Sequence, residues 1–509
     1  MALLAALACL YGAAHLMLQG SGFFPRPTWQ AIVQLAFLII VFNASRKLFY
    51  FVLLPFVLLH AFYTPVGMTF GPPSYQYVAS VFATDLMESR EFMAQLPFSD
   101  YLAALAIVVL VLAFRFITQK FKLRLYHNKF LLALMIVVTL WSTASLKFVQ
   151  EGTTALIQVE QELSRLNAMS IQSEWGESTL TDASKYDDYV LIIGESARKD
   201  YHHAYGYPAD NTPFMSHANG ILIDGFTSGG TNTIASLKLM LTKPDTQTWQ
   251  GNYALNVIDL VKSAGYKTYW ISNQGYLGEF DTPISAIANK SDETIFLKSG
   301  DSANSNTSDF ALLPRFAQVL DQPTADKRFI VLHLYGSHPI TCDRLNDYPK
   351  IYPDEKVDKK YFNVNCYVSS IKKTDEVIRR VYEELVKNEQ KSHRTFSMIY
   401  FSDHGLAHHT EHDGVITLHN SNGASKRHYD IPLFRISSDD SERHEYKVFK
   451  SGLNFTDGIG HWLGIRNDKL NAAVDLFSNW PDPDDYGLKT KIRQMIVPDD
   501  PAVVIPLKP

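Results

Sequence analysis

The sequence predicts a chain in two parts, a membrane domain of five N-terminal helices followed by a soluble α/β domain. Long apolar stretches cluster before residue 150, whereas short β-branched or aromatic runs alternate with helical patterns from about Tyr186 onward. A chain of 509 residues is also too long for one ordinary domain. The formal net charge of −5 gives no reason to expect a nucleic acid partner.

Five apolar stretches form the predicted membrane domain, and each is close to the about 17–25 residues that cross a bilayer as a helix. They are residues 2–18, 29–44, 48–67, 101–117 and 130–146. The first could instead be a cleaved signal peptide, but no basic segment precedes it and no clean small-residue cleavage site follows it. A retained membrane anchor is therefore favoured.

Loop charges predict the orientation of these helices, because cytoplasmic loops collect Lys and Arg. The links between the second and third stretches and between the fourth and fifth are basic, whereas the link between the third and fourth is acidic. The basic residues are Arg46, Lys47, Arg115, Lys120, Lys122, Arg124 and Lys129, and the acidic ones are Asp85, Glu88, Glu91 and Asp100 against Arg90. Despite a lone Arg26 in the first link, this pattern predicts a cytoplasmic N-terminus. Everything after Lys147 then lies on the outer side, which is the periplasm in a bacterium with two membranes.

The predicted domains are a transmembrane domain at residues 1–147, a membrane-proximal helix and polar linker at 148–185, and a periplasmic α/β domain at 186–509. In the last, strands are predicted at 189–193, 266–272, 329–333, 396–401 and 433–436, and helices at 253–264 and 366–386. The second helix carries an apolar stripe that indicates core packing, namely Tyr367, Ile371, Ile378, Val381 and Leu385.

Polar residues follow three of the predicted strands. "VLIIGESARKD" ends a strand on Glu195, "SDHG" places Asp403 and His404 after another, and "HLYGSH" brings His333 and His338. Taken alone, Glu195 is more simply a cap for the next helix. Together the groups meet at one edge of an α/β sheet, where such folds bind ligands.

A glycine-led segment, "FTSGGTNTIASLKLMLT", adds hydroxyl groups to this set. It places Thr231 and Thr233 after two glycines at the start of a predicted helix, where free N–H groups suit an alkoxide or a phosphoryl oxygen. Taken alone, such a threonine is more often a plain helix cap. Two carboxylates, a histidine and a hydroxyl are a ligand set suited to zinc, and the other histidines could serve a second ion.

With these motifs together, the sequence resembles the bacterial phosphoethanolamine transferases of the alkaline phosphatase and sulfatase superfamily. The shared pattern is "GESAR" followed by "YGY" and "TP", then the glycine-led threonine segment, "GSHP", a cysteine at a helix entry and "SDHG". That family also places five membrane helices before a periplasmic catalytic domain, so the resemblance covers nearly the whole chain. It implies an α/β/α sandwich of alkaline phosphatase and sulfatase type.

The resemblance implies roles for the residues at the strand ends. Glu195, Asp403 and His404 match the family's zinc ligands. Thr233 is the second threonine of a Gly-Thr-x-Thr pattern and matches the nucleophile, which also binds the metal. One tightly bound zinc ion is expected, and a second is allowed.

Five further residues match positions that the family places around the substrate. His333, His338 and the His419 of "TLHN" match histidines near the substrate phosphate or a second zinc ion. Thr84 and Glu88 fit the loop motif for the ethanolamine group, although Ser80 stands where some members have Asn. Six other histidines fit no motif and are interpreted as surface or supporting residues: His202, His203, His408, His409, His412 and His428.

The implied reaction takes phosphoethanolamine from phosphatidylethanolamine, releases diacylglycerol and passes through a covalent intermediate on Thr233. A donor that stays in the bilayer would account for the anchor in the bacterial inner membrane. The implied acceptor is lipopolysaccharide or another periplasmic glycan.

Three other interpretations stay open. A sulfatase or phosphatase would use a similar site, but the Cys-x-Pro-x-Arg type signature of sulfatases is absent. A phosphoglycerol transferase shares the threonine chemistry, and "GESAR" argues against it. A membrane sensor with a degenerate domain is disfavoured because Glu195, Thr233, Asp403 and His404 are all intact.

The acceptor is predicted to be a sugar hydroxyl or sugar phosphate of the lipopolysaccharide core. Members that modify lipid A, including the colistin-resistance enzymes, typically carry a cysteine before the Gly-Thr and several more disulfides. Here Gly229 stands in that position and one periplasmic cysteine pair is present. Lipid A modification with polymyxin resistance is the alternative.

Two of the three cysteines are predicted to form a disulfide. Cys342 and Cys366 lie at the two ends of an insertion in the periplasmic domain, where disulfides persist. Two free thiols are the alternative, which the even number of periplasmic cysteines disfavours. Cys9 lies in the first apolar stretch and is expected to be free.

Overall fold

The computed structural model describes residues 1–74, 86–125, 130, 133, 144–167, 172–275, 282–298, 306–411, 413–421 and 423–508. Contacts within the chain define two compact units. The first comprises Met1–Ala79 with Phe92–Gln161, and the second comprises Ser80–Glu91 with Glu162–Pro509. Each unit has a hydrophobic core of its own.

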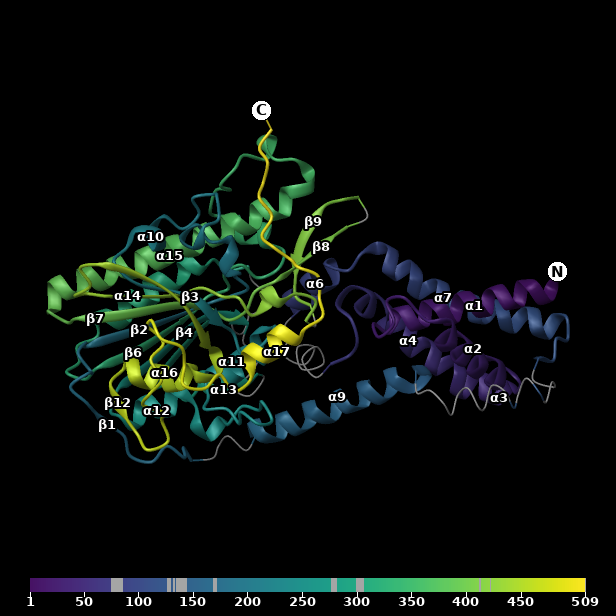
Figure 1. Cartoon of the computed structure of the whole chain (residues 1–509), viewed down its shortest axis with the longest axis horizontal. Helices are drawn as coiled ribbons and strands as arrows, with labels where there is room; N and C mark the ends of the chain where they lie inside the picture. The colour runs from purple at the N-terminus through teal and green to yellow at the C-terminus, as the bar shows by residue number, and fades with distance from the viewer. Residues whose placement is uncertain are drawn as a thin grey trace. The chain divides into compact units, whose positions relative to one another are not determined.

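The first unit is helical (Figure 1). Its helices are α1 (Ala2–Gly20), α2 (Trp29–Asn43), α3 (Arg46–Leu48), the π-helical turn η1 (Phe49–Leu53), α4 (Leu54–Phe70) and α7 (Phe98–Lys120). Helices α6 (Leu86–Ala94) and α9 (Ala144–Asn167) contribute residues to both units. Buried apolar side chains of α1, α2, α4 and α7 form the core of this unit.

Among the described residues, three helical stretches are long and apolar enough to cross a membrane: Ala2–Gly20, Arg46–Phe70 and Phe98–Lys120. They correspond to the first, third and fourth predicted spans. The second predicted span is an apolar helix of 15 residues, and most of the fifth, 130–146, lies outside the described residues. The total of five membrane helices therefore stays a prediction.

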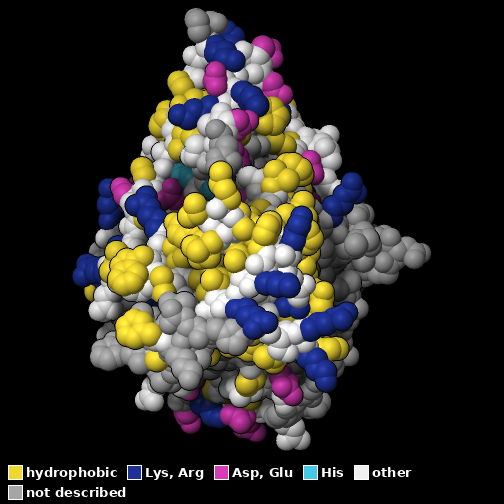
Figure 2. All heavy atoms as spheres, turned by 90° about the vertical axis from the view of Figure 1, so that its right-hand side faces the viewer, with side chains coloured by type: hydrophobic (Ala, Val, Ile, Leu, Met, Phe, Trp, Pro, Cys, Tyr) yellow, Lys and Arg dark blue, Asp and Glu magenta, His cyan; other side chains and the backbone are white. Residues whose placement is uncertain are grey.

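Large apolar side chains are exposed on these helices, and Figure 2 shows hydrophobic side chains gathered on one face of the molecule beside Lys and Arg. Those of the first unit include Leu4, Tyr11, Trp29, Phe51, Phe62 and Phe116. Exposed apolar surface of this extent is typical of helices that face lipid, since lipid tails solvate apolar side chains.

The second unit is built on a mixed sheet with eight strands in the order β11-β3-β10-β7-β2-β6-β4-β5. In that order the strands are Arg443–Ser451, Gly220–Thr227, Leu433–Ser437, Phe396–Ser402, Asp188–Gly194, Arg328–His333, Lys267–Gly275 and Glu293–Lys298. Strand β10 pairs antiparallel with both neighbours, whereas β7, β2, β6, β4 and β5 run parallel. Two small antiparallel pairs complete the unit: β1 (Thr179–Leu180) with β12 (Ile465–Arg466), and β8 (Ala407–Thr410) with β9 (Ile416–His419).

Helices cover both faces of the sheet and make an α/β/α sandwich (Figure 1). One face packs against α11 (Thr233–Met240), α12 (Val257–Ser263), α13 (Pro283–Ala288) and α16 (Phe455–Trp462). The other packs against α10 (Pro213–His217), α14 (Leu312–Asp321) and α15 (Phe362–Ser392). The short helix α17 (Leu488–Gln494) lies near the C-terminus of the chain. This architecture agrees with the predicted sandwich.

The five predicted strands are β2, β4, β6, β7 and β10 in the structure, whereas β3, β5 and β11 were not predicted. The predicted helix 253–264 is in fact two elements, a 3₁₀ turn at Tyr253–Leu255 and α12. Asn256 separates them because its extended backbone ends the turn while its side chain accepts a hydrogen bond from the Asp259 N–H. The apolar stripe of α15 is buried as predicted.

Residues 172–185, which the sequence assigns to the linker, are part of the second unit. Trp175 is buried, and its indole N–H donates to the carbonyl of Asn256. Strand β1 follows at Thr179–Leu180 and pairs with β12, near the end of the fold.

Cys342 and Cys366 form the predicted disulfide, with a Cα–Cα distance of 4.9 Å. It joins the 3₁₀ helix η9 (Thr341–Leu345) to the first turns of α15. Ile340, immediately before η9, has a φ of 60°, a left-handed conformation that a β-branched residue rarely adopts. The bridge therefore fixes a strained segment against a long, buried helix.

We expect the Cys342→Ser, Cys366→Ser double variant to be less stable by about 3 kcal/mol, because the bridge restricts the unfolded chain. The free energy of unfolding of the purified protein, measured in urea with and without reductant, tests this. Reductant should destabilise the unmodified protein and leave the double variant unaffected. Equal stability of both proteins without reductant would contradict the expectation.

Candidate metal centre and catalytic site

Three neighbouring parallel strands bring the candidate site residues to one edge of the sheet. Glu195 follows β2, and Asp403 and His404 follow β7; the last paired residues of these strands are Gly194 and Ser402. Strand β6 lies on the other side of β2 and ends at His333. Because parallel strands end at the same edge, residues more than 200 positions apart in sequence become neighbours here.

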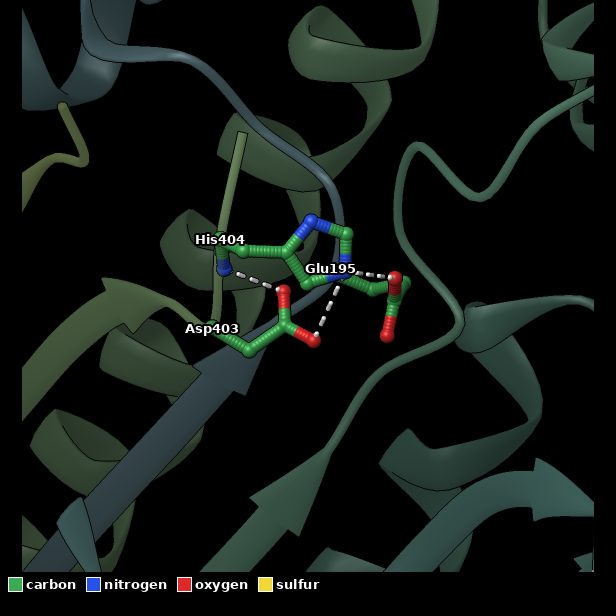
Figure 3. A group of neighbouring side chains, drawn as sticks. All are labelled: Glu195, Asp403 and His404. Atoms are coloured by element: carbon green, nitrogen blue, oxygen red, sulfur yellow. Dashed lines mark hydrogen bonds and ion pairs between the residues drawn. The ribbon is translucent and has the colours of Figure 1, made fainter. Parts of the chain in front are cut away.

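Glu195, Asp403 and His404 point toward one another (Figure 3). His404 Nε2 lies 3.3 Å from Glu195 Oε1 and 3.5 Å from Asp403 Oδ2. Thr233 reaches the same group from α11: its Oγ1 donates to Glu195 Oε2 at 3.0 Å and lies 3.5 Å from His404 Nε2. The structure thus brings together the four residues predicted to form the metal site.

The turn after β2 is held in a tight conformation. Ser196 has a φ of 58°, which is uncommon for a residue other than glycine. Its N–H donates to Asp403 Oδ1 at 2.9 Å, and its hydroxyl donates to Glu195 Oε1 at 2.6 Å. These bonds fix both carboxylates, which supports the strained backbone at this position.

Two glycines let the segment before α11 fold closely against the first turns of that helix. A Cβ at Gly230 would lie 2.7 Å from the Ala235 carbonyl carbon, and one at Gly229 would lie 3.0 Å from the Ser236 oxygen. Asn232 caps α11, accepting from the Ala235 N–H, so Thr233 becomes the first helical residue. This places the Thr233 hydroxyl at the positive end of the helix.

Burial and mutual charge strongly perturb the three titratable groups of the site. Burial and the charge of Glu195 raise the pKa of Asp403 well above its usual range. Burial would also raise the pKa of Glu195, but hydrogen bonding to His404 and the charge of His404 hold it well below its usual range. Burial would lower the pKa of His404, but the charge of Asp403 together with the hydrogen bond and charge of Glu195 raises it to about 9.

The residues of this site fit a metal ion. One ligand atom from each of Glu195, Asp403 and His404 lies within 4.8 Å of the others, as expected around a centre with bonds of about 2.0–2.2 Å. Asp403 Oδ2 is buried without a hydrogen-bond partner among the described residues. His404 Nδ1 donates to the Gly405 carbonyl at 2.8 Å, which leaves Nε2 as the lone-pair donor. A cation bound between the two carboxylates would replace the protons that otherwise compensate their charge.

The three predicted substrate histidines lie in different surroundings. His333 is buried beside Trp270, and burial lowers its pKa to about 4. His338 stacks on Tyr335 with ring centroids 4.6 Å apart and lies 3.3 Å from Glu91 Oε2. His419 ends β9, and its Nδ1 donates to the Asn420 carbonyl. None of the three belongs to the metal-ligand group found among the described residues. Thr84 and the side chain of Glu88 lie outside the described residues.

Two side chains that the sequence did not indicate orient the site. Gln274 Nε2 donates to Glu195 Oε2 at 3.3 Å and to the Leu334 carbonyl at 2.6 Å. His428, which was interpreted as a surface or supporting residue, is buried and its Nδ1 donates to the Gly405 carbonyl at 2.6 Å. Because His404 donates to the same carbonyl, His428 supports the position of the ring that faces the metal site.

A C-terminal strap, residues 499–508, packs against the β8–β9 hairpin that leads from His404 to His419. His408 of β8 donates through Nδ1 to Asp500 Oδ1 at 2.6 Å, and Tyr201 contacts the other ring nitrogen at 2.5 Å. The buried Arg198 donates to the Asp500 carbonyl at 2.6 Å. The strap then pairs with Val357 through Leu507.

An α/β/α sandwich that presents a hydroxyl, two carboxylates and an imidazole at its sheet edge fits an enzyme that uses a hydroxyl nucleophile beside a metal ion. Comparison with known proteins specifies the class. The sulfatase family model matches residues 187–465. Residues 1–186 and 466–509 lie outside that match.

Three relatives are informative. A candidate phosphoethanolamine transferase of Haemophilus influenzae is 54% identical over 404 residues, covering 79% of this chain and 83% of the relative. Phosphoethanolamine transferase OpgE of Escherichia coli is 31% identical over 446 residues, covering 83% and 81%. The integral membrane protein lipooligosaccharide phosphoethanolamine transferase A from Neisseria meningitidis shares the fold with a TM-score of 0.63 at 16% identity, over 92% and 96%.

The chain belongs to the phosphoethanolamine transferases of the alkaline phosphatase and sulfatase superfamily. It is a phosphoethanolamine transferase with membrane-spanning N-terminal helices. The resemblance seen in the sequence is therefore confirmed.

Removing the metal should destabilise the protein, because the two buried carboxylates would then face each other. A ligand present at about 100 times its Kd stabilises the folded state by about 2.7 kcal/mol. We expect a chelator to lower the melting temperature of the unmodified protein and to lower that of Asp403→Asn much less. Elemental analysis should find less bound metal in Asp403→Asn. Asp321→Asn, at an exposed position, is the control, and equal metal content in the two variants would contradict the assignment.

We expect Asp500→Asn to lower stability at neutral pH and to lower transfer by about tenfold, because the strap would hold the hairpin less firmly. Burial would raise the pKa of Asp500, but the hydrogen bond and charge of His408 and the charge of Arg198 hold it well below its usual range. The ionised carboxylate of Asp500 therefore stabilises the folded state above about pH 4, the pKa of an aspartate in the unfolded chain. This stabilisation is lost as the pH falls from there toward the lower pKa of Asp500 in the folded protein. Urea unfolding at pH 7 and pH 3.5 should therefore show a smaller loss on acidification for the variant than for the unmodified protein.

Proposed function

We propose that this enzyme moves phosphoethanolamine from phosphatidylethanolamine to a sugar of the lipopolysaccharide core, through a covalent intermediate on Thr233 and with zinc in the metal site. The observation that carries the proposal is the position of Thr233. Its Oγ1 lies 3.0 Å from Glu195 Oε2 and 3.5 Å from His404 Nε2. A helix-capping threonine would have no reason to point at a buried carboxylate pair.

Zinc suits this ligand set, since carboxylate oxygens and imidazole nitrogen are its usual ligands beside thiolate. Glu195, Asp403, His404 and Thr233 would hold the ion. When bound, zinc lowers the pKa of a hydroxyl group and screens the charge of a phosphate. His333, His338 and His419 are assigned to the substrate phosphate or to a second ion.

The proposed reaction consists of two successive displacements at phosphorus. In the first, the Thr233 hydroxyl loses its proton and Oγ1 forms a bond to phosphorus while the bond from phosphorus to the diacylglycerol oxygen breaks. The leaving oxygen takes up one proton, which balances the one that Thr233 lost. In the second, an acceptor hydroxyl bonds to the same phosphorus and Thr233 leaves with a proton restored. Glu195 accepts the hydrogen bond of the Thr233 hydroxyl and so aims its oxygen. Gln274 and Ser196 hold the Glu195 carboxylate in that direction.

The membrane helices fit a lipid donor. Phosphatidylethanolamine stays in the bilayer, so an enzyme anchored there meets its donor without extracting it. Loop charges support an inner-membrane protein with a cytoplasmic N-terminus and a periplasmic catalytic domain. Residues 1–147, 148–185 and 186–509 are the proposed membrane, connecting and catalytic parts.

The core sugar is proposed as the acceptor because Gly229 stands where members that modify lipid A typically have a cysteine, and because this chain has one disulfide where those members have several more. Lipid A is the alternative acceptor. Mass spectrometry of lipopolysaccharide from a deletion strain and its complement, with core and lipid A separated by mild acid, distinguishes them. Loss of phosphoethanolamine from the core alone supports the proposal. Loss from lipid A alone, with increased polymyxin sensitivity, would support the alternative.

We expect Thr233→Ala to lower transfer by a factor on the order of 10⁴ or more, because the nucleophilic oxygen is removed. Thr231→Ala should lower it by less than about tenfold, since that hydroxyl lies outside the ligand group. Release of diacylglycerol from a fluorescent donor gives the rate, and peptide mass mapping should find the phosphoethanolamine adduct on Thr233. Release at the unmodified rate by the Thr233→Ala enzyme would rule out this nucleophile.

A further inference from the structure

A second polar site lies on the α15 side of the sheet edge. A cavity of about 130 Å³ opens between η9, the first half of α15 and the residues that follow β6. Its lining includes Ser308, Arg344, Asn346, Asp347, Lys373 and Thr374. A water molecule occupies about 30 Å³ in the liquid, so the cavity accommodates several waters or the part of a ligand that replaces them.

Arg344 gives this cavity unsatisfied hydrogen-bond donors. Its side chain is 4% exposed, its guanidinium lies over the Tyr335 ring at 4.6 Å, and one terminal nitrogen pairs with Glu91. The Nε and Nη1 groups are buried without a hydrogen-bond partner among the described residues. A buried donor without a partner costs about 1–3 kcal/mol. A ligand that offers oxygen atoms would remove this cost.

The charges of the lining favour a neutral ligand over a phosphate. Lys373 already pairs with Asp347 at 2.5 Å and donates to the Arg344 carbonyl at 2.7 Å. Asp309 accepts from the backbone N–H groups of Tyr335 and Gly336, both at 2.8 Å. With the exposed Asp343, three carboxylates stand against two cations, so a phosphate dianion would be repelled. Sugar hydroxyls both accept from Arg344 and donate to carboxylate and amide oxygens.

The cavity wall touches the metal site through the backbone. A Cβ at Gly336 would lie 2.9 Å from the Glu195 nitrogen, and the Ser337 N–H donates to the Glu195 carbonyl at 3.0 Å. A ligand held at Gly336 therefore sits beside the segment that carries a metal ligand. We propose that this cavity binds the acceptor glycan through its neutral hydroxyl groups, an inference that rests on the proposed transfer to a sugar.

The segments that form the cavity are held in place before any ligand binds. The disulfide from Cys342 to Cys366 ties η9 to α15, and η9 carries Arg344. Ser370 of α15 donates to the Ser337 hydroxyl at 2.7 Å and closes the inner wall. A site ordered in advance loses less entropy when it binds a flexible glycan.

The test uses Arg344→Lys in the full-length enzyme, because lysine keeps the charge that faces Glu91 but lacks the two unpartnered donors. Arg380→Lys makes the same change on an exposed part of α15 and is the control. The acceptor probes are core oligosaccharide released from lipopolysaccharide by mild acid, and the same material after enzymatic dephosphorylation. The KM for each probe and for phosphatidylethanolamine is measured for all three proteins.

We expect Arg344→Lys to raise the acceptor KM about tenfold for both probes, with a smaller effect on kcat, while Arg380→Lys behaves as the unmodified enzyme. An unchanged acceptor KM, or a rise in the donor KM alone, overturns the cavity assignment. A rise only for the phosphorylated probe overturns the preference for neutral hydroxyls. If the unmodified enzyme releases diacylglycerol but transfers nothing to either probe, the proposed core acceptor fails instead.

Discussion

The arrangement of the catalytic unit depends on two buried carboxylates, those of Glu195 and Asp403, which the fold brings together beside one nitrogen of the His404 imidazole. Their burial excludes water that would otherwise screen them, so only hydrogen bonds, His404 and a cation can compensate. The neighbouring features serve this constraint. Ser196 adopts a left-handed backbone to donate to both carboxylates, and Gly405 lets two histidines share one carbonyl. The position of Thr233 follows from the same cluster, because its hydroxyl donates to Glu195.

The helices and strands that could be predicted are those whose buried positions carry apolar residues in a regular pattern along the sequence. Strands β2, β6 and β7 are buried on both faces, so they appear in the sequence as continuous apolar runs. Edge strands β5 and β11 are partly exposed, and β11 carries charges that protect an edge from further pairing, so neither has such a run. Strand β3 contains two glycines with positive φ, which the strand pattern does not anticipate. Helix α15 was predictable because its buried stripe has the helical period.

Some residues of the candidate site could likewise be predicted from the sequence, whereas others could not. Glu195, Asp403 and His404 stand directly after recognisable strands, so their position alone suggested them, and the threonine motif shared with the family indicated the proposed nucleophile, Thr233. Gln274 and His428 could not be found from the sequence, because each acts through a contact that only the folded backbone creates. The role of Arg344 could not be predicted from the sequence either, because it lies within an insertion that has no regular pattern. Its Nε and Nη1 groups lack hydrogen-bond partners among the described residues only in the folded arrangement, in which η9 packs on α15.

The C-terminal strap changes what counts as the minimal catalytic module. The region matched by the sulfatase family model covers residues 187–465, which contains every proposed metal ligand and the proposed nucleophile. Yet His408 on the active-site hairpin finds its carboxylate partner at Asp500, and Arg198, three residues after Glu195, is neutralised partly by that same residue. A soluble fragment trimmed to the recognisable homology would keep all of the chemistry while exposing a buried arginine and releasing the hairpin. Expression boundaries for the isolated domain therefore have to extend through the strap.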